Sequence, residues 1–183
     1  EGYVDIPPIT ETIKIYRSKL VFTLDTSKVG NSEMQHLDFA YAASLIRSFL
    51  DDDSLVLTIR GRKFTPKFSF NVGKQKIDVE SVQTEVDAGY EGKNQIALIE
   101  AKNSKTANVI IRQLFYPFRQ WSHYSEKKVV TLFFEKRSNY YSLWQFEFLD
   151  KNIYNSIKLV KSYKFENYIP PAIAPLSTSL GVA

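Results

Sequence analysis

Residues 82–102, VQTEVDAGYEGKNQIALIEAK, show the clearest pattern of polar and apolar positions in the chain. Two extended runs flank a cluster of Gly92, Lys93 and Asn94, and glycine and asparagine tolerate the positive φ angles that a tight turn requires. The second run includes residues 96–99, which are apolar on both faces, as in a strand at the centre of a sheet. The pattern therefore predicts a β-hairpin whose second strand is central.

The length of the turn decides which polar side chains face each other. Side chains alternate along a strand, so one face of the first run carries Gln83, Glu85 and Asp87. With a two-residue loop at the turn, Asp87 lies directly across from Glu100. The same register places Glu85 across from Lys102. A different turn length would slip every pair, so this register is a hypothesis.

Two segments have apolar residues at the spacing of an α-helix. The first predicted helix covers residues 33–50, and either Asn31 or Ser32 is placed to cap its start. The second covers residues 107–124, with a kink near Pro117 because proline cannot donate the helical hydrogen bond. Helices of this kind need a sheet or other helices to cover their apolar sides.

Further runs of apolar and polar residues predict strands before and after these elements. They are residues 55–59, 64–72, 128–135, 140–148 and 156–165. Pro66 would place the second of these at a sheet edge or a bulge. Together the elements predict an α/β fold, with a mixed central β-sheet flanked by helices on both faces. We assign residues 1–168 to this one domain and the proline-rich residues 169–183 to a tail or linker.

Composition narrows the classes of function. The 183 residues include 24 lysines and arginines and 20 aspartates and glutamates, for a net charge of +4 and a pI near 9.1. This balance suits a polyanionic partner without requiring one. The absence of cysteine excludes disulfides, thiolate metal sites and cysteine nucleophiles. No apolar run approaches the roughly 18 residues of a membrane span, so we expect no membrane partner.

The motifs of several enzyme classes are missing. The chain has no G-x-S-x-G elbow, no G-x-x-x-x-G-K-[ST] loop, no G-x-G-x-x-G turn and no H-E-x-x-H helix. What remains is the predicted pair of opposed acids, Asp87 and Glu100. With Cβ atoms roughly 5 Å apart, these carboxylates would repel each other unless a cation lay between them. An oxygen-rich site of this kind suits Mg²⁺.

A cluster of carboxylates, metal and lysine suits phosphodiester hydrolysis. Asp87 and Glu100 would hold Mg²⁺, and the carbonyl of Ala101 would add a ligand. Lys102 would orient the attacking water and balance charge in the transition state. The simpler interpretation is a salt-bridged ladder on a surface hairpin. Against it, charges at the end of a strand that is apolar on both faces are costly to bury without a function.

The acids and the lysine also form a known pattern. Asp87 followed by the segment 100–102, Glu-Ala-Lys, resembles the motif of the PD-(D/E)xK nuclease superfamily. The context is most similar to the catalytic domain of a type II restriction endonuclease. The resemblance covers residues 82–121, and Val86 stands where the motif usually has proline.

The resemblance implies more than the residues alone do. It implies a restriction-endonuclease-like fold and cleavage of double-stranded DNA with Mg²⁺, for which Mn²⁺ can substitute. It implies a homodimer that cuts both strands in the cytoplasm of a prokaryotic cell, and it allows a DNA-recognition domain outside this chain. It further implies that Gln113 on the following helix faces the site and that Glu33 supplies another carboxylate.

Two groups of residues are candidates for contact with nucleic acid. They are Arg60, Arg62 and Lys63 in a basic segment, and Arg112, Tyr116 and Arg119 along one face of the second predicted helix. Arginine can bond bidentately to guanine, but it can equally contact phosphate. The simpler interpretation is that these residues keep an edge strand and a helix face soluble.

Two other functions stay open. A catalytically silent module would keep the nuclease fold and bind nucleic acid or a protein partner without cutting. Loss of one of the two acids or of the lysine would favour this alternative, and none of these three is lost here. A repair, junction-resolving or RNA-cutting nuclease would apply the same chemistry to another substrate.

Overall fold

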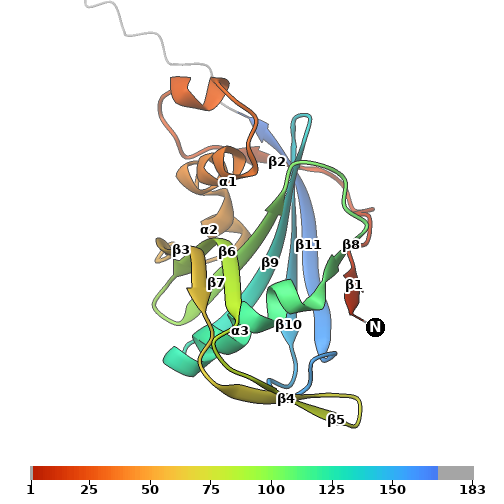
Figure 1. Cartoon of the computed structure of the whole chain (residues 1–183). Helices are drawn as coiled ribbons and strands as arrows, with labels where there is room; N and C mark the ends of the chain where they lie inside the picture. Colours follow the sequence, from red (N-terminus) through yellow and green to blue (C-terminus); the bar gives the residue numbers. More distant parts are fainter. Residues whose placement is uncertain (1, 169–183) are drawn as a thin grey trace, which may run out of the picture.

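The computed structural model describes residues 2–168 and contains a large mixed β-sheet with helices on both faces (Figure 1). Its seven strands are, in spatial order, β2 (Lys14–Arg17), β11 (Ile157–Tyr168), β10 (Tyr140–Phe148), β9 (Lys128–Arg137), β7 (Gln95–Lys102), β6 (Gln83–Glu91) and β3 (Val56–Phe64). Neighbouring strands are antiparallel except for β2–β11 and β7–β9, which are parallel. The predicted α/β fold with a mixed central sheet is confirmed.

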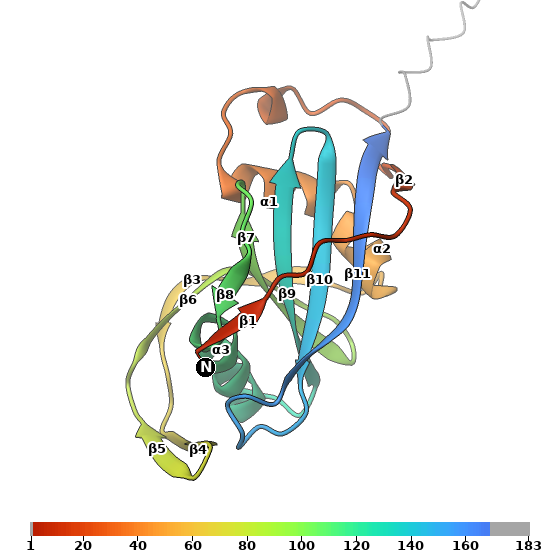
Figure 2. The same ribbon diagram turned by 90° about the vertical axis from the view of Figure 1, so that its right-hand side faces the viewer.

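The remaining elements cover or extend this sheet. They are β1 (Tyr3–Asp5), β4 (Phe68–Val72), β5 (Gln75–Val79), β8 (Asn108–Ile110), the 3-10 helix η1 (Asp25–Lys28), α1 (Glu33–Ala42), α2 (Leu45–Leu50) and α3 (Ile111–Tyr124). β1 pairs with β8 and β4 pairs with β5, as two small antiparallel sheets. Figure 2 shows the β4–β5 ribbon projecting beyond one end of the large sheet.

Each face of the large sheet packs against helices (Figures 1 and 2). On one face, α1 and α2 bury Leu37 and Ile46 in a core that includes Ile99 of β7. On the other face, α3 buries Phe115 in a core that includes Leu98 of β7. Consecutive residues of β7 therefore enter different cores, which explains why this strand is apolar on both faces.

The predicted hairpin is formed by β6 and β7. The N–H of Gly92 donates to the carbonyl of Gln95 at 2.8 Å, which closes a two-residue loop as expected. The ladder between the two strands continues to the pair Ala88 and Ile99 and stops there. The register of this ladder is the predicted one, but the predicted pairs Asp87–Glu100 and Glu85–Lys102 lie beyond its last pair and do not form.

The first predicted helix is wrong in one respect, because residues 33–50 form two helices instead of one. Ser32 caps the start, and its hydroxyl accepts from the N–H of Gln35 at 3.1 Å. α1 ends at Ala42, and Ser44 has a φ of 64°, in the left-handed region. A helix cannot continue through that conformation, so α2 begins after it with a new direction.

The strand boundaries near Pro66 also differ from the prediction. β3 runs from Val56 to Phe64 and so includes the basic segment, and the next strand begins only at Phe68. Pro66 therefore lies in the connection between two strands and not within one. The second predicted helix starts later than residue 107, since residues 108–110 pair with β1 before α3 begins.

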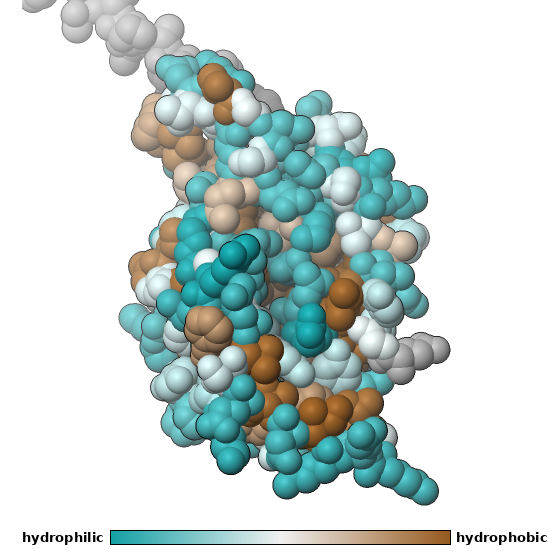
Figure 3. Space-filling view, viewed as in Figure 1, coloured by the Kyte–Doolittle hydropathy of each residue, from teal (hydrophilic) through white to brown (hydrophobic). Residues whose placement is uncertain are grey.

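The three strands predicted towards the end of the described chain are present as β9, β10 and β11. The predicted tail, residues 169–183, lies outside the described residues. Within residues 2–168, no helix has both the length and the apolar character needed to cross a membrane. The face seen in Figure 1 is largely hydrophilic, with hydrophobic residues in separate patches (Figure 3).

Candidate active site

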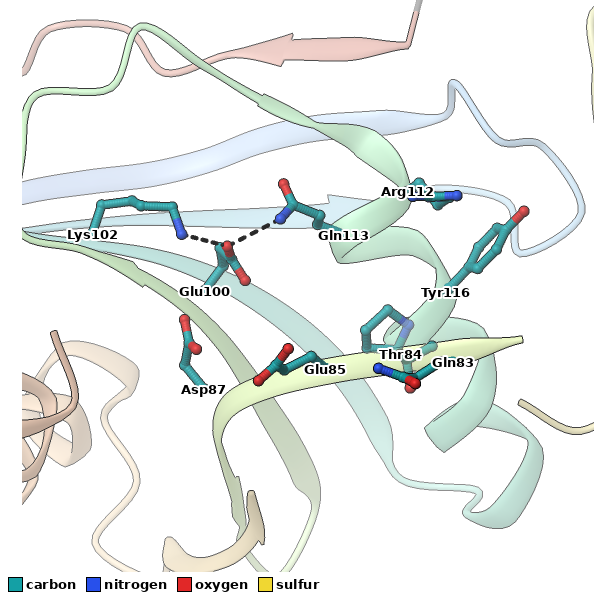
Figure 4. Close-up of a pocket in the computed structure, with 10 residues that line it drawn as sticks. Gln83, Thr84, Glu85, Asp87, Glu100, Lys102, Arg112, Gln113 and Tyr116 are labelled. Carbon is teal, nitrogen blue, oxygen red and sulfur yellow. Dashed lines mark hydrogen bonds and ion pairs between the residues drawn. The ribbon is translucent and has the colours of Figure 1, made fainter. Parts of the chain in front are cut away.

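A cleft opens where β6 and β7 separate. Because the ladder ends at Ala88 and Ile99, the N–H of Ala101 lacks a partner on β6. The carboxylate of Asp87 accepts this N–H at 2.7 Å and so replaces the missing backbone pair. The first turns of α3 cover the gap, which leaves a cleft of about 370 Å³. It is lined by Gln83, Thr84, Glu85, Asp87, Glu100, Lys102, Arg112, Gln113, Tyr116 and Pro117 (Figure 4).

Three predicted catalytic residues meet around the carboxylate of Glu100 (Figure 4). The ammonium of Lys102 donates to its Oε1 at 2.7 Å, and the side-chain amide of Gln113 donates to the same atom at 3.4 Å. The side chain of Glu100 is only 11% exposed, whereas that of Lys102 is 31% exposed. Lys102 therefore lies at the open side of the cluster, where an incoming ligand can meet it.

Burial and mutual contacts change the pKa values of Asp87, Glu100 and Lys102. Desolvation raises the pKa of Asp87, although the N–H of Ala101 and the nearby Lys102 act in the opposite direction. Desolvation also raises the pKa of Glu100 against the hydrogen bond from Lys102. For Lys102, desolvation alone would lower the pKa, but the hydrogen bond and charge of Glu100 outweigh it and raise the pKa. The lysine is held as a cation by its bond to Glu100, and burial makes both Glu100 and Asp87 costly to ionise.

These residues fit a divalent cation that prefers oxygen ligands. Asp87 and Glu100 supply two carboxylates from adjacent strands. We call the place where β6 and β7 separate, beyond Ala88 and Ile99, the fork of the hairpin. The N–H and C=O of one strand residue point to the same edge of the strand, so the carbonyl of Ala101 faces the fork together with its N–H. Mg²⁺ is typically bound by one or two carboxylates and keeps several waters, which matches this set.

Glu33 lies at the margin of the cluster. Its carboxylate accepts from the N–H of Asn103 at 3.4 Å, and its charge contributes to the raised pKa of both Asp87 and Glu100. Among residues 2–168, no three acidic, histidine or cysteine side chains are grouped closely enough to hold a metal ion together. The assignment of Glu33 as a metal ligand stays a prediction.

Of the residues predicted to contact nucleic acid, some lie at the cleft and others contact distant parts of the protein. Arg112 and Tyr116 line the cleft, on the first two turns of α3. Arg62 lies beside it, where its guanidinium donates to Glu85 at 3.3 Å. Lys63 follows on β3 and is exposed.

Arg60 and Arg119 are bound to other parts of the protein. The guanidinium of Arg60 donates to Asp38 of α1 at 2.5 Å. The guanidinium of Arg119 donates to the carbonyls of Ser69 at 2.9 Å and Lys151 at 2.5 Å, and it lies 4.6 Å from the ring centre of Phe68. These contacts tie α3 to the β4–β5 ribbon, which gives Arg119 a structural role.

Four cleft residues were not among the predicted site residues: Gln83, Thr84, Glu85 and Pro117. Strand alternation placed Gln83 and Glu85 on the same face as Asp87, which was a usable signal. The covering helix could not be foreseen from the strand. Besides its core packing, this helix is held to β6 by a buried hydrogen bond in which the hydroxyl of Thr84 donates to the side chain of Gln120 at 2.7 Å.

The fold and the cleft define a mixed α/β protein that holds two acids and a lysine where its central hairpin opens. The chain belongs to the family described as Domain of unknown function (DUF6997), whose model matches residues 1–166. No curated protein and no solved structure matches the chain significantly. The chemistry of the cleft is therefore the basis for a function.

Proposed function

We propose that the protein is a Mg²⁺-dependent endonuclease that hydrolyses phosphodiester bonds in DNA. The observation that carries the proposal is the convergence of Asp87, Glu100 and Lys102 at the hairpin fork, within a cleft that a helix covers. The resemblance of these residues to the PD-(D/E)xK motif supports it, and so does a mixed sheet with helices on both faces. A restriction-endonuclease-like fold is part of the proposal.

The residues divide the chemistry between them. Asp87, Glu100 and the carbonyl of Ala101 would hold Mg²⁺, which neutralises the phosphate and lowers the pKa of a water. Lys102 remains a cation because Glu100 raises its pKa. On leaving Glu100 it can donate to a phosphate oxygen, where charge develops in the transition state. Gln113 already contacts the cluster through its amide and would help to orient the attacking water.

The remaining attributes of the proposal rest on the resemblance. The substrate would be double-stranded DNA, cut on both strands by a homodimer in the cytoplasm of a prokaryotic cell. Mn²⁺ would substitute for Mg²⁺. A further DNA-recognition domain outside this chain is compatible with the small number of unengaged basic residues near the cleft.

One observation favours a second candidate. Oε1 of Glu100 already accepts from both Lys102 and Gln113, so the cluster is a closed network of hydrogen bonds. A catalytically silent module that binds nucleic acid or a protein partner would need no more than this. The two candidates differ in whether Asp87 is required for strand scission.

The test is nicking of supercoiled plasmid in the presence of Mg²⁺ or Mn²⁺. We expect nicking by the wild type and by Asp53→Ala, whose side chain is 83% exposed on the surface, and none by Asp87→Ala. Equal nicking by Asp87→Ala would assign the activity to a contaminant or another site. No nicking by the wild type with either metal would overturn the proposal.

A further inference from the structure

The cleft continues well past the acids and the lysine. Figure 4 shows Asp87 and Lys102 at one end, and Gln83 and Tyr116 at the other. Gln83 precedes Asp87 by four positions on β6, which corresponds to about 13 Å at roughly 3.3 Å per strand residue. The proposed chemistry does not use this far end.

Tyr116 gives the far end a rigid aromatic wall. Its ring makes edge contacts with Phe68 and Phe70, with ring centres 5.7 and 5.9 Å apart. The ring is half-buried by these contacts and borders the cleft. Because the neighbouring rings hold it, it can accept a flat ligand without a large loss of side-chain entropy.

The polar groups around Tyr116 complete a surface for a flat, hydrogen-bonding ligand. Thr84 is bound to Gln120, whose amide also donates to the carbonyl of Phe64 at 3.3 Å, so these groups are already satisfied. Gln83 is exposed on the cleft wall and presents both an amide donor and an acceptor. Arg112, one helical turn before Tyr116, adds a cation at the rim.

We infer that this end of the cleft is a nucleobase subsite, in which Tyr116 stacks on an unpaired base and Gln83 bonds its edge. The inference rests on the proposed nuclease function for the identity of the ligand. The phosphate of the same nucleotide lies towards Arg112, and the base belongs to a nucleotide beside the one that is cut. Within the proposed double-stranded substrate, the preferred cleavage point is then one next to which a strand is locally unpaired.

The requirement for an unpaired base follows from the shape of the site. In a duplex the bases are stacked and expose only their edges in the grooves. A base that enters a cleft between β6 and α3 must leave the stack, and this costs least when it is already single-stranded. Stacking on one aromatic side chain compensates for that cost in a single strand, whereas in a duplex the lost pairing must be compensated as well.

The test measures binding without cleavage, in EDTA, by fluorescence anisotropy. The probe is a labelled oligonucleotide, either single-stranded or annealed to its complement. We expect the wild type to bind the single strand more tightly than the duplex. Tyr116→Leu and Gln83→Ala should each weaken single-strand binding, the former by about tenfold, within the range for base stacking on an aromatic residue.

Matched variants separate this role from general damage. Tyr116→Phe keeps the ring and should bind as the wild type does. Tyr124→Leu changes a tyrosine of the same helix that lies outside the cleft and is 62% exposed. Gln75→Ala removes an exposed glutamine from β5. Neither control should change binding. An abasic strand lacks both the stacking on Tyr116 and the bond to Gln83, so it should bind the wild type at least as weakly as an intact strand binds Tyr116→Leu, and it should lose nothing further in that variant.

Several results would overturn the subsite. The wild type could bind the duplex as tightly as the single strand or more tightly, or it could fail to bind the single strand. Tyr116→Leu could also lower the affinity for intact and abasic strands by the same factor. The nuclease proposal fails separately, through absence of nicking that depends on Asp87. Nicking with no effect of Tyr116→Leu on single-strand binding would keep the nuclease and remove the subsite.

Discussion

Lys102 and Arg119 are both cations with restricted access to water, but they lie in opposite surroundings. Lys102 is bound to the carboxylate of Glu100, and the nearby acids raise its pKa. Arg119 is bound to two backbone carbonyls and lies over Phe68, and desolvation lowers its pKa. One cation is surrounded by charges and the other by the fixed dipoles of the fold.

This difference indicates which cation is available to a ligand. A carboxylate can exchange a lysine for a metal ion, and the released ammonium can then contact a phosphate. Backbone carbonyls of β4 and of the turn after β10 have no such alternative, because without Arg119 they must find water. Under the proposed function, burial at the fork of β6 and β7 serves the chemistry, whereas burial at the contact between α3 and β4 serves the structure.

The largest expected effect is on activity at Lys102. Lys102→Ala should lower the initial rate of plasmid nicking by about 100- to 1000-fold, as for the loss of a preorganised donor to developing charge. Arg119→Ala should leave the rate per folded molecule unchanged. The measurement is nicking at matched concentrations of folded protein, determined by circular dichroism.

Lys102→Arg is the matched control for charge. A planar guanidinium differs in shape and reach from an ammonium, so we expect it to recover little of the rate. A rate for Lys102→Ala within about tenfold of the wild type would correspond to less than about 1.4 kcal/mol of barrier. That result would remove Lys102 from the chemistry and make the two cations equivalent.

The fork could be predicted from the sequence because the residues that determine it lie close together in the chain. The two extended runs leave a loop of Lys93 and Asn94, and the loop length sets the register. The expected reason for the turn is wrong, because none of Gly92, Lys93 and Asn94 has a positive φ. Once the register is known, Asp87 and Glu100 occupy the first positions past the last pair of the ladder. The apolar residues of β7 added that this strand is central.

The surroundings of Arg119 could not be predicted in this way. Its partners Ser69 and Lys151 are 50 and 32 residues away, and they offer backbone carbonyls that every residue has. The break at Ser44 is hidden for a related reason, since the apolar spacing continues across it and a positive φ at serine has no sequence signal. The contact of α3 with β6 includes the hydrogen bond between Thr84 and Gln120, which no periodicity links.

The next largest effect is on stability at Arg119. Arg119→Ala removes two hydrogen bonds from a charged donor and a cation–π contact, and it should lower the free energy of unfolding by about 2 kcal/mol after allowance for partial exposure. Urea denaturation measures this change. Arg112→Ala, at an exposed arginine of the same helix, should stay within about 0.5 kcal/mol of the wild type. If both variants lose equally, Arg119 has no special structural role.

A smaller effect on stability is expected from Asp87→Asn in EDTA. Burial raises the pKa of Asp87 in the folded state above its unfolded value of about 3.9, so at neutral pH the ionised carboxylate destabilises the fold. The amide oxygen of asparagine can still accept from the N–H of Ala101. The variant should therefore be more stable than the wild type at neutral pH, and the gain should vanish below about pH 4, where both states are protonated.

Urea titrations across this pH range measure the effect, with Asp53→Asn as the exposed control. Asp53 is 83% exposed, so its variant should not be more stable than the wild type. A variant Asp87→Asn that is less stable than the wild type at neutral pH would mean that Lys102 and the N–H of Ala101 outweigh desolvation. The contrast between the two cations would then lose its electrostatic basis.

The smallest effect on stability is expected at Arg62, where it tests whether a surface arginine near the cleft has a functional use. The Arg62–Glu85 pair spans 3.3 Å with side chains 68% and 58% exposed, and pairs of this kind contribute about 0–1 kcal/mol. Arg62→Ala should therefore unfold at nearly the same urea concentration as the wild type. If Arg62 exchanges Glu85 for a phosphate when DNA binds, the variant should also lower the slope of log affinity against log salt by about one.

Lys76→Ala provides the matched control, because Lys76 pairs with Asp78 at 4.0 Å, with both side chains 68% exposed, on β5 outside the cleft. It should change neither stability nor the salt slope. Equal slopes for the wild type and both variants would show that Arg62 only keeps an edge strand soluble. A lower slope for Arg62→Ala alone would add a third kind of cation to the comparison, one that the fold leaves at the surface and that DNA engages.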